Sequence, residues 1–129
     1  CFRAAFQDSP AGKAIVDADL RFLHVNRALC DLAGHSETAF RALTLDAVTH
    51  APGRAELFRL TGEMFQGKLE RFQTEGTLIA STGAELPVSV TITLIRGGEP
   101  AAPHAVVRIE DQTAQRRRER DLRLAREAR

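Results

Sequence analysis

The sequence contains no Trp and no Tyr, and only two Cys and one Met among its 129 residues. All seven of its Phe, Tyr and Trp residues are Phe, so rings suited to stacking the bases of single-stranded nucleic acid are in short supply. Its two cysteines, Cys1 and Cys30, form neither a C-x-x-C pair nor a disulfide framework. That usage is typical of a reduced compartment. We therefore expect a cytoplasmic protein.

Long apolar runs and common catalytic motifs are also missing. No window approaches 18 uninterrupted apolar residues, which argues against a membrane-spanning helix here, although the parent protein could be tethered to a membrane by other segments. There is no G-x-S-x-G, no P-loop and no paired-carboxylate signature. The four His residues lack HxH or HxxxH spacing, so no metal site is predicted. We expect these residues to be non-catalytic, while the parent protein could carry an effector enzyme.

The overall amino-acid composition is that of an ordinary globular domain. Apolar residues make up 43% and charged residues 27%, and the length suits one domain with its own core. The net charge of +1 conceals an uneven distribution, because residues 114–129 carry seven Arg against three acidic residues. Basic sequence interrupted by acids is typical of a solvated connector helix. We therefore expect no nucleic-acid contact.

Hydrophobic spacing in the first half predicts a helix, a hairpin and further helices. A short helix should end at Ser9–Pro10, and strands at 14–16 and 22–25 should flank a polar turn. Helical spacing then runs to Gly34, a residue suited to a left-handed helix end, after which Ser36 fits a helix N-cap. A longer amphipathic helix is predicted over 53–68, with one apolar face formed by Leu57, Leu60, Met64 and Phe65.

The last third reads as strands followed by a helix. Two long strands, 72–80 and 86–95, should be joined by a Gly-containing turn, with a further strand at 104–111. The second strand alternates cleanly, with one apolar face formed by Leu86, Val88, Val90, Ile92 and Leu94. Thr113 is the predicted N-cap of an exit helix, which we expect to continue beyond Arg129 in the parent protein.

The order of these elements, with several short motifs, resembles the PAS family. Asn26 opens the helix that follows the hairpin, Gly34 and Ser36 match the helix end and the next cap, and His35 stands where the family usually has an aromatic. Residues 82–85 match the family's turn between long strands, and residues 111–113 match its D-x-T junction into the exit helix. The resemblance spans nearly the whole chain.

This resemblance implies an α+β fold. The PAS fold has a five-stranded antiparallel sheet of order 2-1-5-4-3 with helices packed on one face, here with N-terminal and C-terminal flanking helices. The implied division is a flanking helix at 1–9, the PAS domain at 10–112 and a connector helix at 113–129.

The resemblance also implies a role in signal transduction. PAS domains sense small ligands or relay conformational signals, here to an effector in the same chain: a histidine kinase of a two-component system, a cyclic-di-GMP enzyme, a phosphatase or a transcription regulator. A ligand-free interaction and dimerisation module with a self-filled core remains an open alternative. A homodimer is expected, through the flanking helices or the sheet face.

Two sets of residues follow from the resemblance and from local chemistry. A ligand pocket, if one forms, should be lined by Leu29, Phe40, Leu60, Met64, Val90 and Ile92, with His35 at its edge. Asn26 and Gly34 should shape the strand-to-helix corner, while Asp111 and Thr113 should cap the exit helix and transmit signals. Cys30 is interpreted as a small core residue rather than a nucleophile.

The sequence identifies no cofactor. A flavin–cysteinyl sensor of the light-oxygen-voltage type would carry a Cys in the segment after Gly34, and 41–50 has none. A haem sensor usually takes an axial His from its longer helix, and 53–68 contains none. Both types are disfavoured, and the existence of any ligand stays open.

Overall fold

The computed structural model describes residues 2–49, 53–97 and 103–128. Its elements follow in the order α1 (Phe2–Asp8), β1 (Gly12–Asp17), β2 (Phe22–Val25), α2 (Arg27–Ala33), α3 (Glu37–Arg41), a 3-10 turn η1 (Leu45–Val48), α4 (Gly53–Phe65), β3 (Arg71–Ile79), β4 (Glu85–Ile95), β5 (His104–Asp111) and α5 (Thr113–Glu127). The strands and helices expected from the hydrophobic spacing are all present, with small shifts at their ends.

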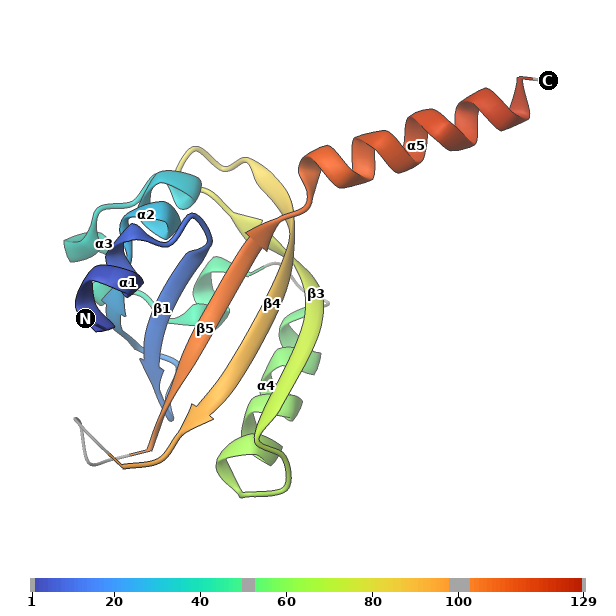
Figure 1. Ribbon diagram of the computed structural model, residues 1–129. Coiled ribbons are helices and arrows are strands. Elements are labelled where there is room, and N and C mark those ends of the chain that lie inside the picture. The colour runs from blue at the N-terminus through green and yellow to red at the C-terminus, as the bar shows by residue number, and fades with distance from the viewer. Residues whose placement is uncertain (1, 50–52, 98–102, 129) are drawn as a thin grey trace.

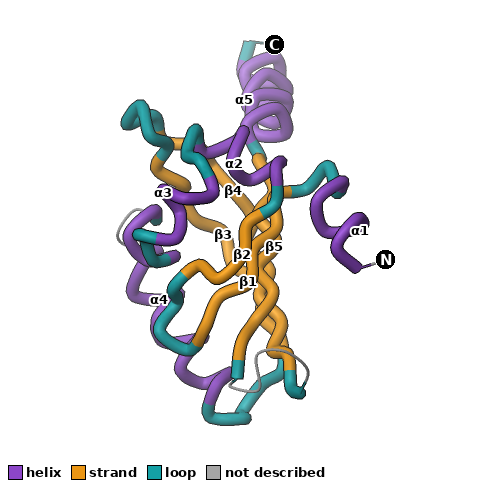
Figure 2. Tube along the Cα trace, turned by 90° about the vertical axis from the view of Figure 1, so that its left-hand side faces the viewer, coloured by secondary structure: helices purple, strands orange, loops and turns teal. Residues whose placement is uncertain are grey.

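The five strands form one antiparallel sheet of order β2-β1-β5-β4-β3. Helices α3 and α4 lie on one side of this sheet, whereas α1 lies on the other side (Figure 2). The predicted α+β fold, its strand order and its flanking helices are therefore confirmed.

The core lies between the sheet and the helical layer. The predicted alternation of β4 is correct, because Val88, Val90 and Ile92 are buried while Leu86 and Leu94 pack against the same core. Burial of apolar surface contributes about 25 cal/mol per Å², which makes this layer the main source of stability. The core-facing side of α4 differs in one respect from the prediction, because it includes a buried polar residue, Thr61, between Leu57 and Met64.

The C-terminal helix α5 extends away from this body (Figure 1). None of its residues is buried, and the helix leaves the body where β5 ends (Figure 1). The site of interest is therefore the point where β5 becomes α5.

Candidate functional site

Asn26 holds the corner where β2 ends and α2 begins. Its side chain is fully buried. The Oδ1 atom accepts hydrogen bonds from the N–H of Leu29 (3.0 Å) and of Lys13 (2.8 Å), and Nδ2 donates to the carbonyls of Phe6 and Ala11 (both 2.9 Å). The first contact is the N-cap predicted for α2. The other three join α1, the segment after it and β1, so one amide fixes four parts of the chain.

Gly34 ends α2 in the left-handed conformation, with φ of 74°. The prediction of a left-handed helix end at this residue is confirmed. A Cβ at this position would lie 2.5 Å from Ser81 Oγ in the β3–β4 turn, and the Ser81 N–H donates to the Ala33 carbonyl (2.8 Å). Glycine is therefore favoured by φ, and a side chain here would also force the exposed Ser81 hydroxyl to move.

The Cys and His residues near this corner contribute packing. The His35 ring meets the Phe40 ring edge-on at 5.3 Å between centroids, so His35 occupies an aromatic position with an aromatic contact. Cys30 is half-buried, and its pKa is raised by burial first and then by the nearby carboxylates of Glu37 and Asp31. A thiol held protonated is a poor nucleophile, which agrees with its interpretation as a packing residue. Cys1 lies outside the described residues.

The residues predicted to line a ligand pocket come together in the core. Leu29, Phe40, Met64, Val90 and Ile92 are buried in one cluster, and Leu60 packs against it. His35 touches this cluster through Phe40. The groove described below is lined by other residues. That these side chains bound a ligand cavity therefore stays a prediction.

The junction between β5 and α5 is held by Asp111. One carboxylate oxygen, Oδ1, accepts hydrogen bonds from the Thr113 N–H (2.8 Å) and the Thr113 hydroxyl (2.6 Å). Gln112 occupies the N-cap position but makes no side-chain cap, so the prediction of Thr113 as N-cap is wrong by one residue. The reason is that a carboxylate is a stronger acceptor for the first free N–H groups than a hydroxyl or amide. Asp111 therefore provides the cap that was predicted for Asp111 and Thr113 together.

Two further contacts tie the first turn of α5 to the neighbouring strands. The Gln112 N–H donates to the Pro87 carbonyl on β4 (2.8 Å). Arg116 Nη2 lies 3.4 Å from Glu75 Oε2 on β3. The Arg116–Glu75 pair is exposed on both sides, so it contributes little free energy. Each of the strands β3, β4 and β5 therefore has a contact to the start of the helix.

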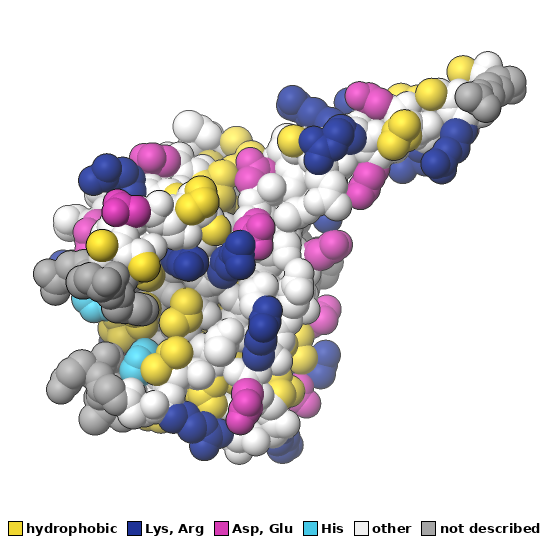
Figure 3. All heavy atoms as spheres, in the orientation of Figure 1, with side chains coloured by type: hydrophobic (Ala, Val, Ile, Leu, Met, Phe, Trp, Pro, Cys, Tyr) yellow, Lys and Arg dark blue, Asp and Glu magenta, His cyan; other side chains and the backbone are white. Residues whose placement is uncertain are grey.

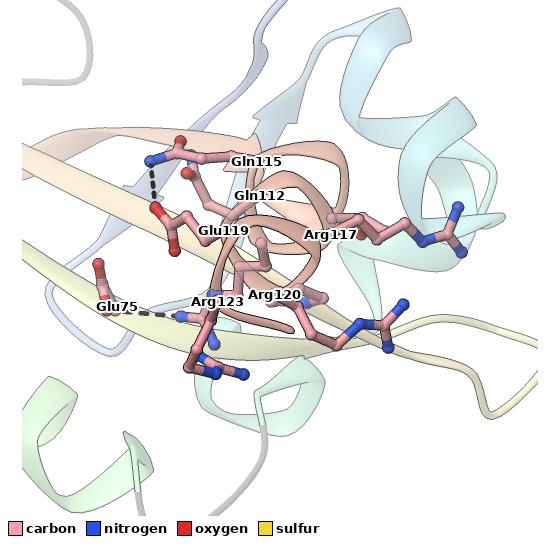
Figure 4. Close-up of a pocket in the computed structure, with 10 residues that line it drawn as sticks. Glu75, Gln112, Gln115, Arg117, Glu119, Arg120 and Arg123 are labelled. Atoms are coloured by element: carbon pink, nitrogen blue, oxygen red, sulfur yellow. Dashed lines mark hydrogen bonds and ion pairs between the residues drawn. The ribbon is translucent and has the colours of Figure 1, made fainter. Parts of the chain in front are cut away.

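These contacts border an open groove of about 600 Å³ between α5 and the sheet (Figure 4). Its charged residues are four arginines and two glutamates: Arg116, Arg117, Arg120, Arg123, Glu75 and Glu119. Glu75 points from β3 toward the helix, and Glu119 is bonded to Gln115 on the helix itself (Figure 4). The groove is therefore positively charged and was not found by sequence reasoning, because Glu75 is remote from α5 in the chain.

A family model described as PAS fold matches residues 6–117. The chain belongs to the PAS family. The matched range begins within α1 and ends in the first turns of α5, so it includes both the Asn26 corner and the Asp111 junction.

A relative from Escherichia coli is similar to most of this chain. The probable diguanylate cyclase DgcE of Escherichia coli (strain K12) is 24% identical over 110 residues, which are 85% of this chain and 10% of that protein. This chain thus spans about a tenth of that relative's length. The PAS domain of an HTR-like protein from Haloarcula marismortui has a TM-score of 0.72 at 19% identity, covering 85% of this chain and 88% of the other.

A second solved structure has a similar fold. It is a domain of a sensory box sensor histidine kinase/response regulator from Geobacter sulfurreducens, with a TM-score of 0.67 at 24% identity, covering 83% of this chain and 89% of the other. Both likenesses concern the fold.

Among the described residues, no helix is both long enough and apolar enough to cross a bilayer. Across residues 2–49, 53–97 and 103–128, His, Cys, Asp and Glu side chains do not gather in groups of three or more that could hold a metal ion.

Proposed function

We propose that this PAS domain relays a conformational signal from its sheet to a C-terminal effector domain through α5. The observation that carries the proposal is the junction at Asp111. Helix α5 has no buried residue and leaves the body directly from the end of β5 (Figure 1). A helix attached only through its first turn takes its direction from the strands that hold that turn.

The contacts of the first turn supply a physical route for such a signal. On β5, Asp111 contacts Thr113. On β4, Pro87 contacts Gln112. On β3, Glu75 contacts Arg116. A small displacement of one strand relative to another would favour a different set of these contacts. The helix would then point in a different direction, which is a two-state equilibrium that an input can bias.

The closed core supports a relay rather than a ligand sensor at the predicted pocket. Five of the six predicted wall residues are buried in one packed cluster, and close-packed interiors transmit displacements instead of absorbing them. The Asn26 network adds a second possible input near the same end of the sheet, because α1 is bonded through Asn26 to the start of α2. A displacement of α1 would therefore reach the helical layer and the sheet.

The exposed apolar side chains of α5 support a homodimer. Leu122 and Leu124 are 60% and 52% exposed. Hydrophobic side chains lie between Lys or Arg side chains on the surface of this helix (Figure 3). A single exposed helix of this length is marginally stable in water. Helix α5 could pair with its copy along Leu122 and Ala125, or along Leu124 and Ala128, and either pairing would bury apolar surface. It would also connect the β5–α5 junctions of both protomers to the same effector output.

The relatives suggest classes of effector for the parent protein. One matched relative is named as a probable diguanylate cyclase and one matched structure comes from a histidine kinase. We propose an effector of one of these classes, acting in the cytoplasm, with the PAS domain itself non-catalytic.

Output of the full-length parent protein tests the relay. Asp111→Ala removes the carboxylate that holds the first turn, and we expect a folded domain with an altered basal output or an altered response. Asp121→Ala is the matched control, because Asp121 is an exposed carboxylate farther along the same helix. Unchanged output in the Asp111 variant, or an equal change in both variants, would contradict the proposal.

A further inference from the structure

The groove between α5 and the sheet carries more positive charge than its own carboxylates neutralise. Its lining contains four arginines and two glutamates, which leaves an excess of two positive charges. The guanidinium group of arginine stays protonated throughout the pH range in which proteins are folded. The uncharged part of the lining is mostly polar, with Gln112, Thr113 and Gln115 beside Pro87. The groove therefore has the chemistry of an anion site rather than that of an apolar pocket.

Most of these arginines have no carboxylate partner. Glu75 is paired with Arg116 at 3.4 Å, whereas Glu119 accepts a hydrogen bond from Gln115 (3.3 Å) instead of from an arginine. Among the described residues, the other three arginines of the groove form no ion pair. They are Arg117, Arg120 and Arg123. Their side chains extend outward from the helix (Figure 4), so three guanidinium groups are open to an anion from solution.

The placement of the arginines is unfavourable for α5 by itself. Arg116, Arg120 and Arg123 follow one another at spacings of four and three residues, which place them along one face of the helix, where like charges destabilise it. The first turn of α5 contains no acidic residue, although negative side chains stabilise the start of a helix and positive ones do not. Departures from such local rules without a gain inside the fold are typical of functional surfaces. A bound anion would remove the repulsion along this face.

The length of the arginine row selects the kind of anion. From Arg116 to Arg123 the helix rises by about 10 Å. One guanidinium group binds one phosphate group through two parallel hydrogen bonds, so a single phosphate cannot engage the whole row. Several linked phosphate groups extend along it. The groove has a volume of about 600 Å³, within the range of small-molecule sites, so a molecule of nucleotide size fits.

We propose that this groove binds a small soluble anion that carries two or more linked phosphate groups. That chemistry is shared by inorganic oligophosphates and by nucleoside diphosphates and triphosphates. The phosphate groups lie along Arg116, Arg120 and Arg123. Glu75 competes with the ligand for Arg116, because that guanidinium is the one paired with a carboxylate of the sheet. The site stands on the charges of the groove and does not depend on the relay through α5.

A binding experiment with defined probes tests the site. Inorganic tripolyphosphate, ATP and orthophosphate are titrated into the ¹⁵N-labelled protein at fixed ionic strength without divalent cations, and the amide shifts are followed by NMR. We expect saturable shifts centred on residues 112–123 and on Glu75 with tripolyphosphate and ATP, and about tenfold or more weaker binding of orthophosphate. Equal affinities of the first two probes would support recognition of the phosphate chain alone, and tighter binding of ATP would support a nucleotide as its source.

Four outcomes would overturn the proposal. They are absence of saturation with both probes, shifts centred elsewhere, orthophosphate binding as tight as that of tripolyphosphate, and tighter binding of a short single-stranded RNA than of ATP. The last result would assign the arginine row to a nucleic acid instead of a small molecule.

Matched variants separate a site from general attraction to a basic helix. Arg120→Gln and Arg118→Gln each remove one exposed positive charge from α5, but Arg118 does not line the groove. The affinity for tripolyphosphate should fall about three- to tenfold in Arg120→Gln and less than about twofold in Arg118→Gln. Equal losses in the two variants would overturn the site.

Glu75→Gln tests the predicted competition for Arg116. Removing an exposed carboxylate that competes with the ligand should raise the affinity for tripolyphosphate about two- to threefold. A lower affinity in this variant would contradict the placement of the phosphate groups at Arg116. None of these affinities depends on the output test at Asp111, so the two proposals fail independently.

Discussion

Replacing Asn26 by Ala should destabilise the domain far more than loss of an ordinary helix cap. The wild-type side chain makes four hydrogen bonds, of which those with Leu29 and Phe6 are fully buried. Each buried group left without a partner costs about 1–3 kcal/mol, and loss of a cap alone costs about 1 kcal/mol. Two buried groups and two partly buried ones together give an expected loss of about 3–5 kcal/mol. That is a large fraction of the stability of a typical domain.

Urea unfolding followed by circular dichroism measures this loss, with Ser36→Ala as the matched control. Ser36 caps α3 through one exposed bond to the Ala39 N–H (3.1 Å), so its loss should cost about 1 kcal/mol. Asn26→Ser retains a hydroxyl for the cap but cannot reach the other segments, and it should recover only about 1 kcal/mol relative to Asn26→Ala. Equal destabilisation by Asn26→Ala and Ser36→Ala would refute the claim that Asn26 joins four segments.

Three further predictions concern single residues. Gly34→Ala should cost more than Gly83→Ala in urea unfolding, because both have positive φ but only Gly34 faces a neighbour, Ser81 Oγ, at 2.5 Å; equal losses would show that the close approach does not matter. Cys30 should react with iodoacetamide more slowly in the folded than in the urea-unfolded protein, as read by peptide mass spectrometry, because its pKa is raised on folding. For the same reason deprotonation of this thiol favours unfolding, so its contribution to stability is present at neutral pH and declines as pH rises through the folded-state pKa. Equal reaction rates of the folded and the unfolded protein at every pH would contradict the raised pKa. Glu75→Ala should change the free energy of unfolding by less than about 1 kcal/mol, because the Glu75–Arg116 pair is exposed, and a larger loss would show that this pair holds the fold as well as the helix direction.

The local features of the fold were predictable from the sequence. The cap at Asn26, the left-handed end at Gly34 and the alternation along β4 each depend on a few neighbouring residues. The same residues have further roles that depend on segments far away in the chain. Asn26 also bonds to Phe6 and Ala11, and spacing along the chain does not indicate such contacts.

The candidate sites were less predictable for the same reason. The groove beside α5 needs Glu75 of β3, which is remote from that helix in the chain. Thr61 lies within the predicted amphipathic helix, but spacing along the chain did not indicate that it would be buried on the core-facing side. The cap of α5 was misplaced by one residue because Asp111, Gln112 and Thr113 are all plausible caps, and the competition is decided by the geometry at the end of β5.

The central claim is that the contacts of its first turn set the direction of α5. Spin labels at Thr77→Cys on β3 and Leu124→Cys on α5, in a background with Cys1 and Cys30 replaced by Ala, report that direction as a distance distribution by double electron–electron resonance. The account predicts a narrow distribution that shifts or broadens when Asp111→Ala is added, and that stays unchanged with Asp121→Ala. The same distribution with and without the Asp111 carboxylate would contradict it.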